Sequence, residues 1–375
     1  MDIEQIDFGD LEFIENGDHF VVKRAKQFFR LGKLEGNMLR DLKEKGNIPQ
    51  ILSTYNIKEE DLEGFIMQLE SAGVIGTEKT EHKNILFYKV SLFNPDRFLD
   101  SLVKNLFHYT YVNNFLILLL GLIILLGFVL FFNNFNDITT NLLIDFVLSD
   151  FALFYISTIT TVFLHEIGHA VTCKYYGGKV EEIGFLLLFF SPALYCDVSG
   201  IRMFSKKKEK VITLLAGVFV QLIIFSLVSI LYHYFFWGSS FLATFAIWNL
   251  LMIVSNIIPV IKLDGYWILS SVLDIPNLYE KSLKLVLGNQ EGVLFNEREI
   301  RMKKFVKIFG IMNILFVFIS AFMGLFGIYF MSTRLEGIYK YISITINTLI
   351  YLLILIFFTR FLIKMMKHKF STQRA

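Results

Sequence analysis

Two hydrophobic patterns divide the chain. Up to about residue 95, apolar side chains come in short groups broken by charges, whereas from residue 115 onward they form long uninterrupted runs. Residues 59–72 have apolar side chains at the i, i+3, i+4 and i+7 spacing of an amphipathic helix: Leu62, Phe65, Ile66 and Leu69. The pattern predicts a small α+β domain over 1–95, a polar connector over 96–114 and a helical membrane domain over 115–375.

The first domain is expected to contain three helices and a hairpin. The helices are 36–45, 48–55 and 59–72. Pro49 stands at the start of the second and Gly73 just after the third, where each residue type is favoured. The expected strands are 20–22, 28–31, 74–75 and 85–90, the last two pairing across a polar turn. This arrangement is that of a winged helix.

The charges of this domain argue against nucleic-acid binding. The third helix carries five acidic side chains, which phosphates would repel: Glu59, Glu60, Asp61, Glu63 and Glu70. The phrases at 28–31 (Phe-Phe-Arg-Leu) and 68–75 (Gln-Leu-Glu-Ser-Ala-Gly-Val-Ile) resemble the winged-helix peptide-recognition domain of the pyrroloquinoline-quinone chaperone type. That resemblance implies binding of a leader peptide by addition of a strand to a sheet edge.

The apolar runs predict a polytopic membrane protein of about six transmembrane helices. These are 115–132, 151–172, 211–231, 241–260, 308–330 and 341–363, each close to the length that crosses the hydrocarbon core. The loops 133–150 and 232–240 contain no Lys or Arg, whereas 200–210, 281–307 and the residues after Arg360 are basic. The positive-inside rule then predicts a multi-pass membrane protein with both termini in the cytoplasm.

Composition supports this class and narrows the chemistry. The chain of 375 residues is 54% hydrophobic and only 19% charged, with a net charge of +2, so no basic field attracts nucleic acid. Cys173 and Cys196 form neither a disulfide framework nor a Cys-x-x-Cys zinc site. The amino terminus is acidic and shows no cleavable signal peptide.

The second membrane segment contains the pattern His165-Glu166-x-x-His169. On a helix, positions i and i+4 share a face, so the two imidazoles can bind one metal ion. Glu166 can then accept a proton from water bound to the metal. The alternative is a pair of packed histidines, but imidazole nitrogens in an apolar helix need partners that lipid does not supply. The pattern predicts one catalytic zinc ion.

A catalytic zinc site needs a third protein ligand, and Asp264 is the candidate. The fourth segment runs from outside to inside, like the second, so Asp264 emerges from it at about the depth of His165 and His169. A carboxylate would complete a His₂-carboxylate set. The alternative is that Asp264 only caps the helix expected to start near Tyr266.

The two patterns together resemble the site-2 protease family of intramembrane zinc metalloproteases, over about residues 150–275. Its second signature, Asn-x-x-Pro-x-x-x-Leu-Asp-Gly, matches Asn256 to Gly265. The resemblance implies that His165, His169 and Asp264 bind zinc and that Glu166 is the general base. It also implies that Asn256 holds the substrate backbone or the oxyanion. The chain departs from the family at 216–221, which reads Ala-Gly-Val-Phe-Val-Gln where Ala-Gly-Pro-x-x-Asn is common.

Residues 183–193 are an apolar run of 11 residues, too short to span the membrane and interrupted by Pro192. We expect a re-entrant hairpin or an edge strand beside the site, which could capture an extended substrate. A simple interfacial loop is the alternative.

Phrases at 192–199 and 262–267 resemble, within the family, peptide zinc metalloproteases encoded beside modified-peptide biosynthesis enzymes. The expected function is hydrolysis of a peptide bond in a small peptide precursor, modified or unmodified, near the cytoplasmic face of a bacterial membrane. The expected partners are the peptide or membrane-protein substrate, the lipid bilayer, and a peptide-modifying enzyme or exporter. Two other functions stay open: regulated cleavage of a membrane-anchored signalling protein, and non-catalytic peptide binding or export on a protease-like scaffold.

Overall fold

The computed structural model describes residues 7–17, 19–25, 27–76, 87–106, 110–142, 148–188, 191–288 and 300–334, and the isolated residues 341, 344–345, 348–349, 352, 356 and 359. The chain divides into two compact units, residues 1–254 and 255–375.

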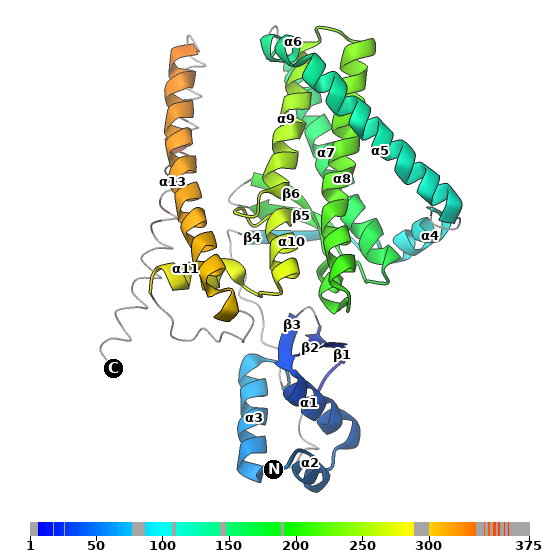
Figure 1. Ribbon diagram of the computed structural model, residues 1–375, viewed down its shortest axis with the longest axis vertical. Helices are drawn as coiled ribbons and strands as arrows, with labels where there is room; N and C mark the ends of the chain where they lie inside the picture. Colours follow the sequence, from blue (N-terminus) through cyan, green and yellow to red (C-terminus); the bar gives the residue numbers. More distant parts are fainter. Residues whose placement is uncertain are drawn as a thin grey trace. The chain divides into compact units, whose positions relative to one another are not determined.

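The first unit begins with a sheet followed by three helices (Figure 1). The strands β1 (Leu11–Asn16), β2 (His19–Arg24) and β3 (Gln27–Gly32) form an antiparallel meander in sequence order. The helices are α1 (Lys33–Lys45), α2 (Ile48–Tyr55) and α3 (Glu59–Ala72). Side chains from both layers make one apolar core, which includes Phe20, Val22, Leu39, Ile51 and Leu62. The buried guanidinium of Arg24 donates to the carbonyls of Gly73 and Gly76, and so fixes β2 to the end of α3.

The sequence predicted these helices closely but not the pairing of the strands. Gly73 ends α3 in the left-handed conformation, with φ of 82°, as expected of a helix-terminating glycine. β1 was not predicted at all. The predicted hairpin of 74–75 with 85–90 is wrong, because β4 (Phe87–Phe93) pairs instead with a strand almost 100 residues later in the chain. A short apolar run predicts a strand but does not determine which other strand it pairs with.

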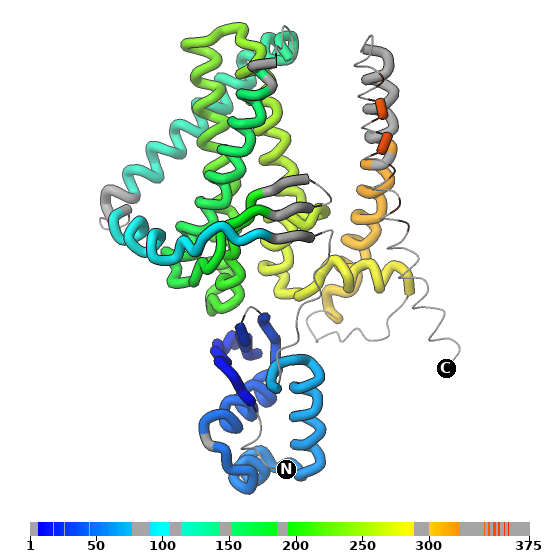
Figure 2. The backbone as a smooth tube through the Cα atoms, turned by 180° about the vertical axis from the view of Figure 1, so that it is seen from behind, coloured from blue at the N-terminus to red at the C-terminus, as the bar shows by residue number. Residues whose placement is uncertain are grey.

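A second three-stranded sheet has the order β4–β5–β6, and Figure 2 shows its strands side by side. The strands β5 (Ile183–Leu188) and β6 (Ser191–Cys196) form an antiparallel hairpin, and β4 pairs with the other side of β5. A hairpin at 183–193 is therefore confirmed, with its second strand extending to Cys196, and its re-entrant position in a membrane stays a prediction. β6 occupies one edge of this sheet among the described strands.

The connector predicted for 96–114 contains a helix, α4 (Asp96–Leu106). Its Leu99 is fully buried in a core with Ala170 and Cys173, while Phe98 on the other side is 64% exposed. Asp96 and Asp100 both form ion pairs with Lys174, at 2.8 and 3.2 Å. Burial works against the charge of Asp96, but the ion pair and a hydrogen bond from the N–H of Val180 hold the pKa of Asp96 below its usual value.

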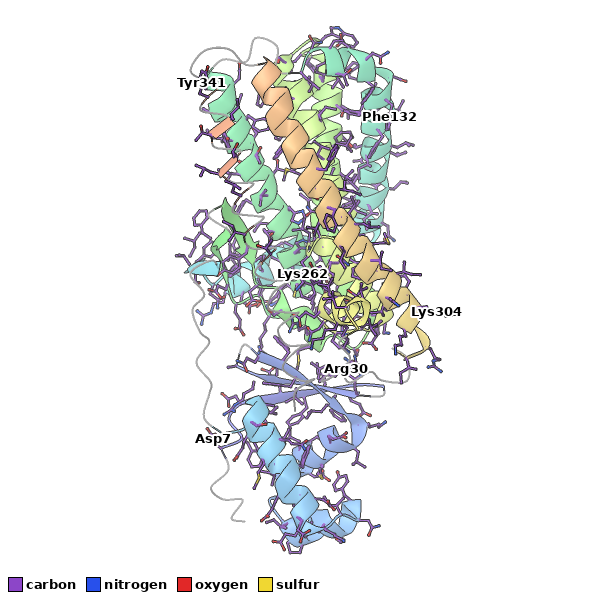
Figure 3. All side chains as sticks on the ribbon, turned by 90° about the vertical axis from the view of Figure 1, so that its left-hand side faces the viewer. Asp7, Arg30, Phe132, Lys262, Lys304 and Tyr341 are labelled. Carbon is purple, nitrogen blue, oxygen red and sulfur yellow. The ribbon has the colours of Figure 1, made fainter. Side chains whose placement is uncertain are left out.

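Long apolar helices make up the rest of the first unit. They are α5 (Thr110–Asn133), α7 (Leu148–Tyr175), α8 (Lys207–Tyr234) and α9 (Ser240–Ile257), which continues past residue 254; the short helices α6 (Phe135–Thr140) and η2 (Ser199–Met203) lie between them in the sequence. α5 exposes a nearly continuous apolar surface, and Figure 3 shows Phe132 projecting outward from it. A helix that is apolar all round and exposed is typical of contact with lipid.

Among the described residues, three helices are long and apolar enough to cross a membrane: 114–133 within α5, all of α8, and α9. They correspond to three of the six predicted spans. α7 and α13 coincide with two others as helices, and the span predicted at 341–363 lies largely outside the described residues. The total of six spans and the orientation of the termini stay predictions.

The second unit contains α10 (Asp264–Leu273), α11 (Leu278–Val286) and α13 (Lys303–Arg334). Tyr266, Leu278, Leu285 and Phe309 belong to its buried core. The N–H of Tyr279 donates to the hydroxyl of Tyr266, so the starts of α10 and α11 are held together.

The packing of α5 on α8 depends on a glycine. A Cβ placed on Gly127 would lie 2.3 Å from the Cα of Ser226, a distance that real structures do not tolerate. Membrane helices commonly approach one another at such small residues, because packing rather than water drives their association.

We expect Gly127→Ala to destabilise the protein by about 1–3 kcal/mol, because the added methyl group must push α5 away from α8. Gly121→Ala on the same helix is the matched control, since a Cβ there meets nothing within 4 Å. Thermal unfolding in detergent measures both. Equal melting temperatures for the two variants would show that the close approach contributes no stability.

Candidate metal centre

The two histidines of the His-Glu-x-x-His pattern lie one turn apart on α7 and are both buried. Their Nε2 atoms are 3.0 Å apart. Two nitrogens bound to one zinc ion at about 2.0–2.1 Å in tetrahedral geometry would be roughly 3.3 Å apart. The pair therefore has close to the spacing that a shared metal ion requires.

A hydrogen bond to a backbone carbonyl of α8 orients His169. The Nδ1 atom of His169 lies 2.8 Å from the backbone carbonyl of Thr213. A carbonyl only accepts, so Nδ1 carries the proton and the lone pair of Nε2 is directed at the metal position. Hydrogen bonds of this kind fix the tautomer and the ring orientation of metal-binding histidines.

Gly217 leaves room on α8 beside the two rings. A Cβ at Gly217 would lie 2.5 Å from Nε2 of His169 and 2.6 Å from Nε2 of His165. On the facing helix, a Cβ at Gly168 would lie 2.9 Å from the carbonyl oxygen of Ala216. The two glycines let α7 and α8 approach closely, and any larger residue at 217 would place a side chain against both Nε2 atoms.

Glu166 lies next to His165 on α7 and reaches the end of β6. Its Oε2 accepts a hydrogen bond of 2.9 Å from the backbone N–H of Cys196. The thiol of Cys196 is itself buried, and burial together with the neighbouring Glu166 carboxylate raises the pKa of this thiol. A thiol kept protonated is a poor zinc ligand.

Asp264 is the first residue of α10 and follows a tight connection from the end of α9. A Cβ at Gly265 would lie 2.1 Å from the carbonyl oxygen of Ile257, so only glycine allows this connection. His165, His169 and Asp264 each offer one ligand atom to a group in which all these atoms lie within 4.8 Å of one another. Imidazole and carboxylate donors in this number suit zinc. Asn256 lies in the last turn of α9, and its predicted role stays a prediction.

Sequence reasoning named the three candidate ligands but not the groups that contact the His165–Glu166–His169 segment. The carbonyl of Thr213 and the N–H of Cys196 are backbone atoms, which every residue has, so no residue type reveals them. Gly217 did stand in the segment compared with the family pattern, yet its position against the imidazoles depends on how α7 and α8 pack. Gln221, where the chain departs from that pattern, is buried one turn further along α8.

Two curated proteins are similar to this chain. The "Putative peptide zinc metalloprotease protein YydH" of Bacillus subtilis is 29% identical over 118 residues, which are 31% of this chain and 46% of the relative. The "Zinc metalloprotease MJ0392" of Methanocaldococcus jannaschii is 28% identical over 178 residues, which are 46% of this chain and 47% of the relative. This chain resembles zinc metalloproteases. The matched part spans about half the length of each relative. No family model and no solved structure matches the chain.

We expect Gly217→Ala to weaken zinc binding at least about tenfold, because the added methyl group occupies the space in front of both Nε2 atoms and a fixed ligand geometry tolerates little displacement. Leu215→Ala, at an exposed position of the same helix, is the control. Zinc retained after dialysis against a chelator of known affinity measures the effect. Equal retention by both variants would place the ion elsewhere.

Proposed function

We propose that this protein is a zinc metalloendopeptidase of the intramembrane, site-2 protease type. The observation that carries the proposal is the paired Nε2 atoms of His165 and His169, 3.0 Å apart, with Glu166 between them in sequence. The two relatives are named as zinc metalloproteases, which supports the same chemistry.

His165, His169 and Asp264 would hold the ion. Zinc bound there supplies a Lewis acid that polarises the substrate carbonyl and lowers the pKa of bound water. Glu166 accepts a proton from the attacking water and returns it to the leaving amine, so its carboxylate must lie within hydrogen-bond reach of both. Asn256 donates a hydrogen bond to the oxyanion or to the unwound substrate backbone. The buried imidazoles favour this chemistry, because a site shielded from bulk water strengthens each of these interactions.

The substrate enters as an extended strand. A helix keeps its carbonyls in its own hydrogen bonds, so a peptide must unwind before it can be cut. The edge strand β6 ends beside Glu166, and a strand added to that edge would present its carbonyls to the site. This supports the predicted role of the 183–193 hairpin in substrate capture.

A small peptide precursor is the substrate class that we propose. Among the described strands, the sheet of the amino-terminal domain ends at β1 and β3, and the third helix, α3, is acidic. A sheet edge and an acidic surface both suit peptide binding better than nucleic-acid binding. We propose that this domain, residues 1–95, holds the leader while the membrane domain, residues 115–375, cuts. The word "peptide" in the name of the Bacillus relative supports the same substrate class.

We propose that the site lies near the cytoplasmic face of a bacterial cytoplasmic membrane, in a domain of about six spans with both termini inside. Three apolar helices support membrane insertion. The basic residues at the start of α8, Lys206 to Lys208 and Lys210, support a cytoplasmic position for that end of the helix. A peptide-modifying enzyme or an exporter would then meet the same peptide on either side of the membrane.

The purified protein is expected to carry about one zinc ion per chain and to cleave short leader-bearing precursors. Glu166→Gln should keep the zinc and lose about 10²–10⁴-fold in kcat, because it cannot accept the proton. His165→Ala should lose both zinc and cleavage. The control is Glu280→Gln, which removes an exposed carboxylate on α11. Zinc analysis and mass spectrometry of the products measure these effects.

Two results would contradict the proposal. If the wild-type protein and Glu166→Gln both bind the precursor and neither cuts it, the protein is a peptide receptor or exporter. If it cuts only membrane-anchored proteins and never a short precursor, the enzyme class stands and the substrate class is wrong.

A further inference from the structure

The backbone of β6 divides its hydrogen-bonding groups between two sides. The N–H of Asp197, just after the strand, donates to the carbonyl of Glu182, next to β5, at 2.8 Å. The preceding N–H, of Cys196, points the other way and donates to Glu166 at 2.9 Å. In a strand of an antiparallel sheet, the N–H and C=O of one residue point to the same side, and successive residues alternate. Residues 192, 194 and 196 therefore face the outer edge of the sheet.

Pro192 agrees with this assignment. Proline has no N–H, so within a sheet it is confined to positions where that N–H would not enter a ladder. In the register of the hairpin, Pro192 is opposite Leu187 and Cys196 is opposite Ile183, and both belong to the outward-facing set. The carbonyl of Cys196 already accepts a hydrogen bond of 3.0 Å from the N–H of Val198. Within the described part of the chain, the outer edge then offers the carbonyl of Pro192 and the N–H and C=O of Leu194.

We infer that the backbone N–H of Cys196 is a positioning group for the catalytic base, and that Leu194 is the residue of β6 that pairs with substrate. This inference rests on the proposed function. The N–H of Cys196 is already bound to the Glu166 carboxylate, so a substrate strand cannot use it. Leu194 is then the outward-facing residue with both a donor and an acceptor to offer.

The arrangement links substrate binding to the orientation of the base. A hydrogen bond from N–H to a carboxylate is charge-assisted and fixes the oxygen that accepts it. Glu166 is therefore held by the strand to which the substrate adds. Two substrate residues matter here: one paired with Leu194 and one opposite Cys196. They are two residues apart on the substrate strand, or about 6.7 Å. The bond to be cut lies at that second residue, beside Glu166.

An α-hydroxy acid incorporated at one position of the full-length protein replaces a backbone amide by an ester. The ester lacks the N–H of that position and, unlike proline, does not restrict the backbone angles. The ester at 196 should lower kcat about ten- to hundredfold with KM and zinc content unchanged, because it releases Glu166. The ester at 194 should raise KM by a similar factor, because it removes a hydrogen bond to substrate. The ester at 195, whose N–H faces β5, should lower the melting temperature more than it changes kcat or KM.

Each contrary result has a distinct meaning. If the unmodified enzyme cuts and the ester at 196 leaves kcat unchanged or acts only on KM, the positioning role is wrong. If the esters at 195 and 196 lower kcat equally, the effect is a general loss of sheet structure, and the inference fails in the same way. If the unmodified enzyme binds zinc but cuts no peptide, the proposed function itself has failed, before any ester is compared.

Discussion

The close approach of α7 to α8 is the constraint on which the candidate site depends. Glycines on both helices bring the backbones together. This contact keeps side chains of α8 away from the two Nε2 atoms at position 217 and places the Thr213 carbonyl against His169. Within an apolar bundle, neither effect could come from water or from a flexible surface loop. The geometry that suits a metal ion is thus a property of helix packing, and the histidine side chains alone would not produce it.

The parts of this structure that the sequence predicted are those with a local signal. The apolar spacing of 59–72, the terminating Gly73 and the i, i+4 pair of histidines each depend on neighbours along one helix. Asp264 was named as the third candidate because it follows the fourth apolar segment, which was predicted to run in the same direction as the second. The helix α4 was missed although Asn94 and Pro95 before it are a local start signal. The pairing of β4 with β5 and the backbone donors and acceptors at the site were not predictable from local signals. They arise from contacts between residues far apart in the chain.

The second sheet provides backbone hydrogen-bonding groups that a bundle of helices cannot offer to another chain. A helix uses its own N–H and C=O groups internally, whereas the outer edge of β6 leaves some of them available for another chain. Open edges are a liability in most proteins because any extended segment can add to them. Here the edge is short, contains Pro192, and ends at a carboxylate that takes one of its donors. These features restrict what can add to the edge and where.

The ion pairs of Lys174 have a consequence for how the protein responds to its bilayer. A lysine near the end of a membrane helix ordinarily extends toward the lipid headgroups, so that the helix adjusts its vertical position to the membrane. Lys174 is instead bound to Asp96 and Asp100 of α4 and is almost buried. The end of α7 is therefore fixed by the protein, five residues from His169. A thinner or thicker bilayer would act on exposed helices such as α5, and the two imidazoles would keep their positions relative to α4.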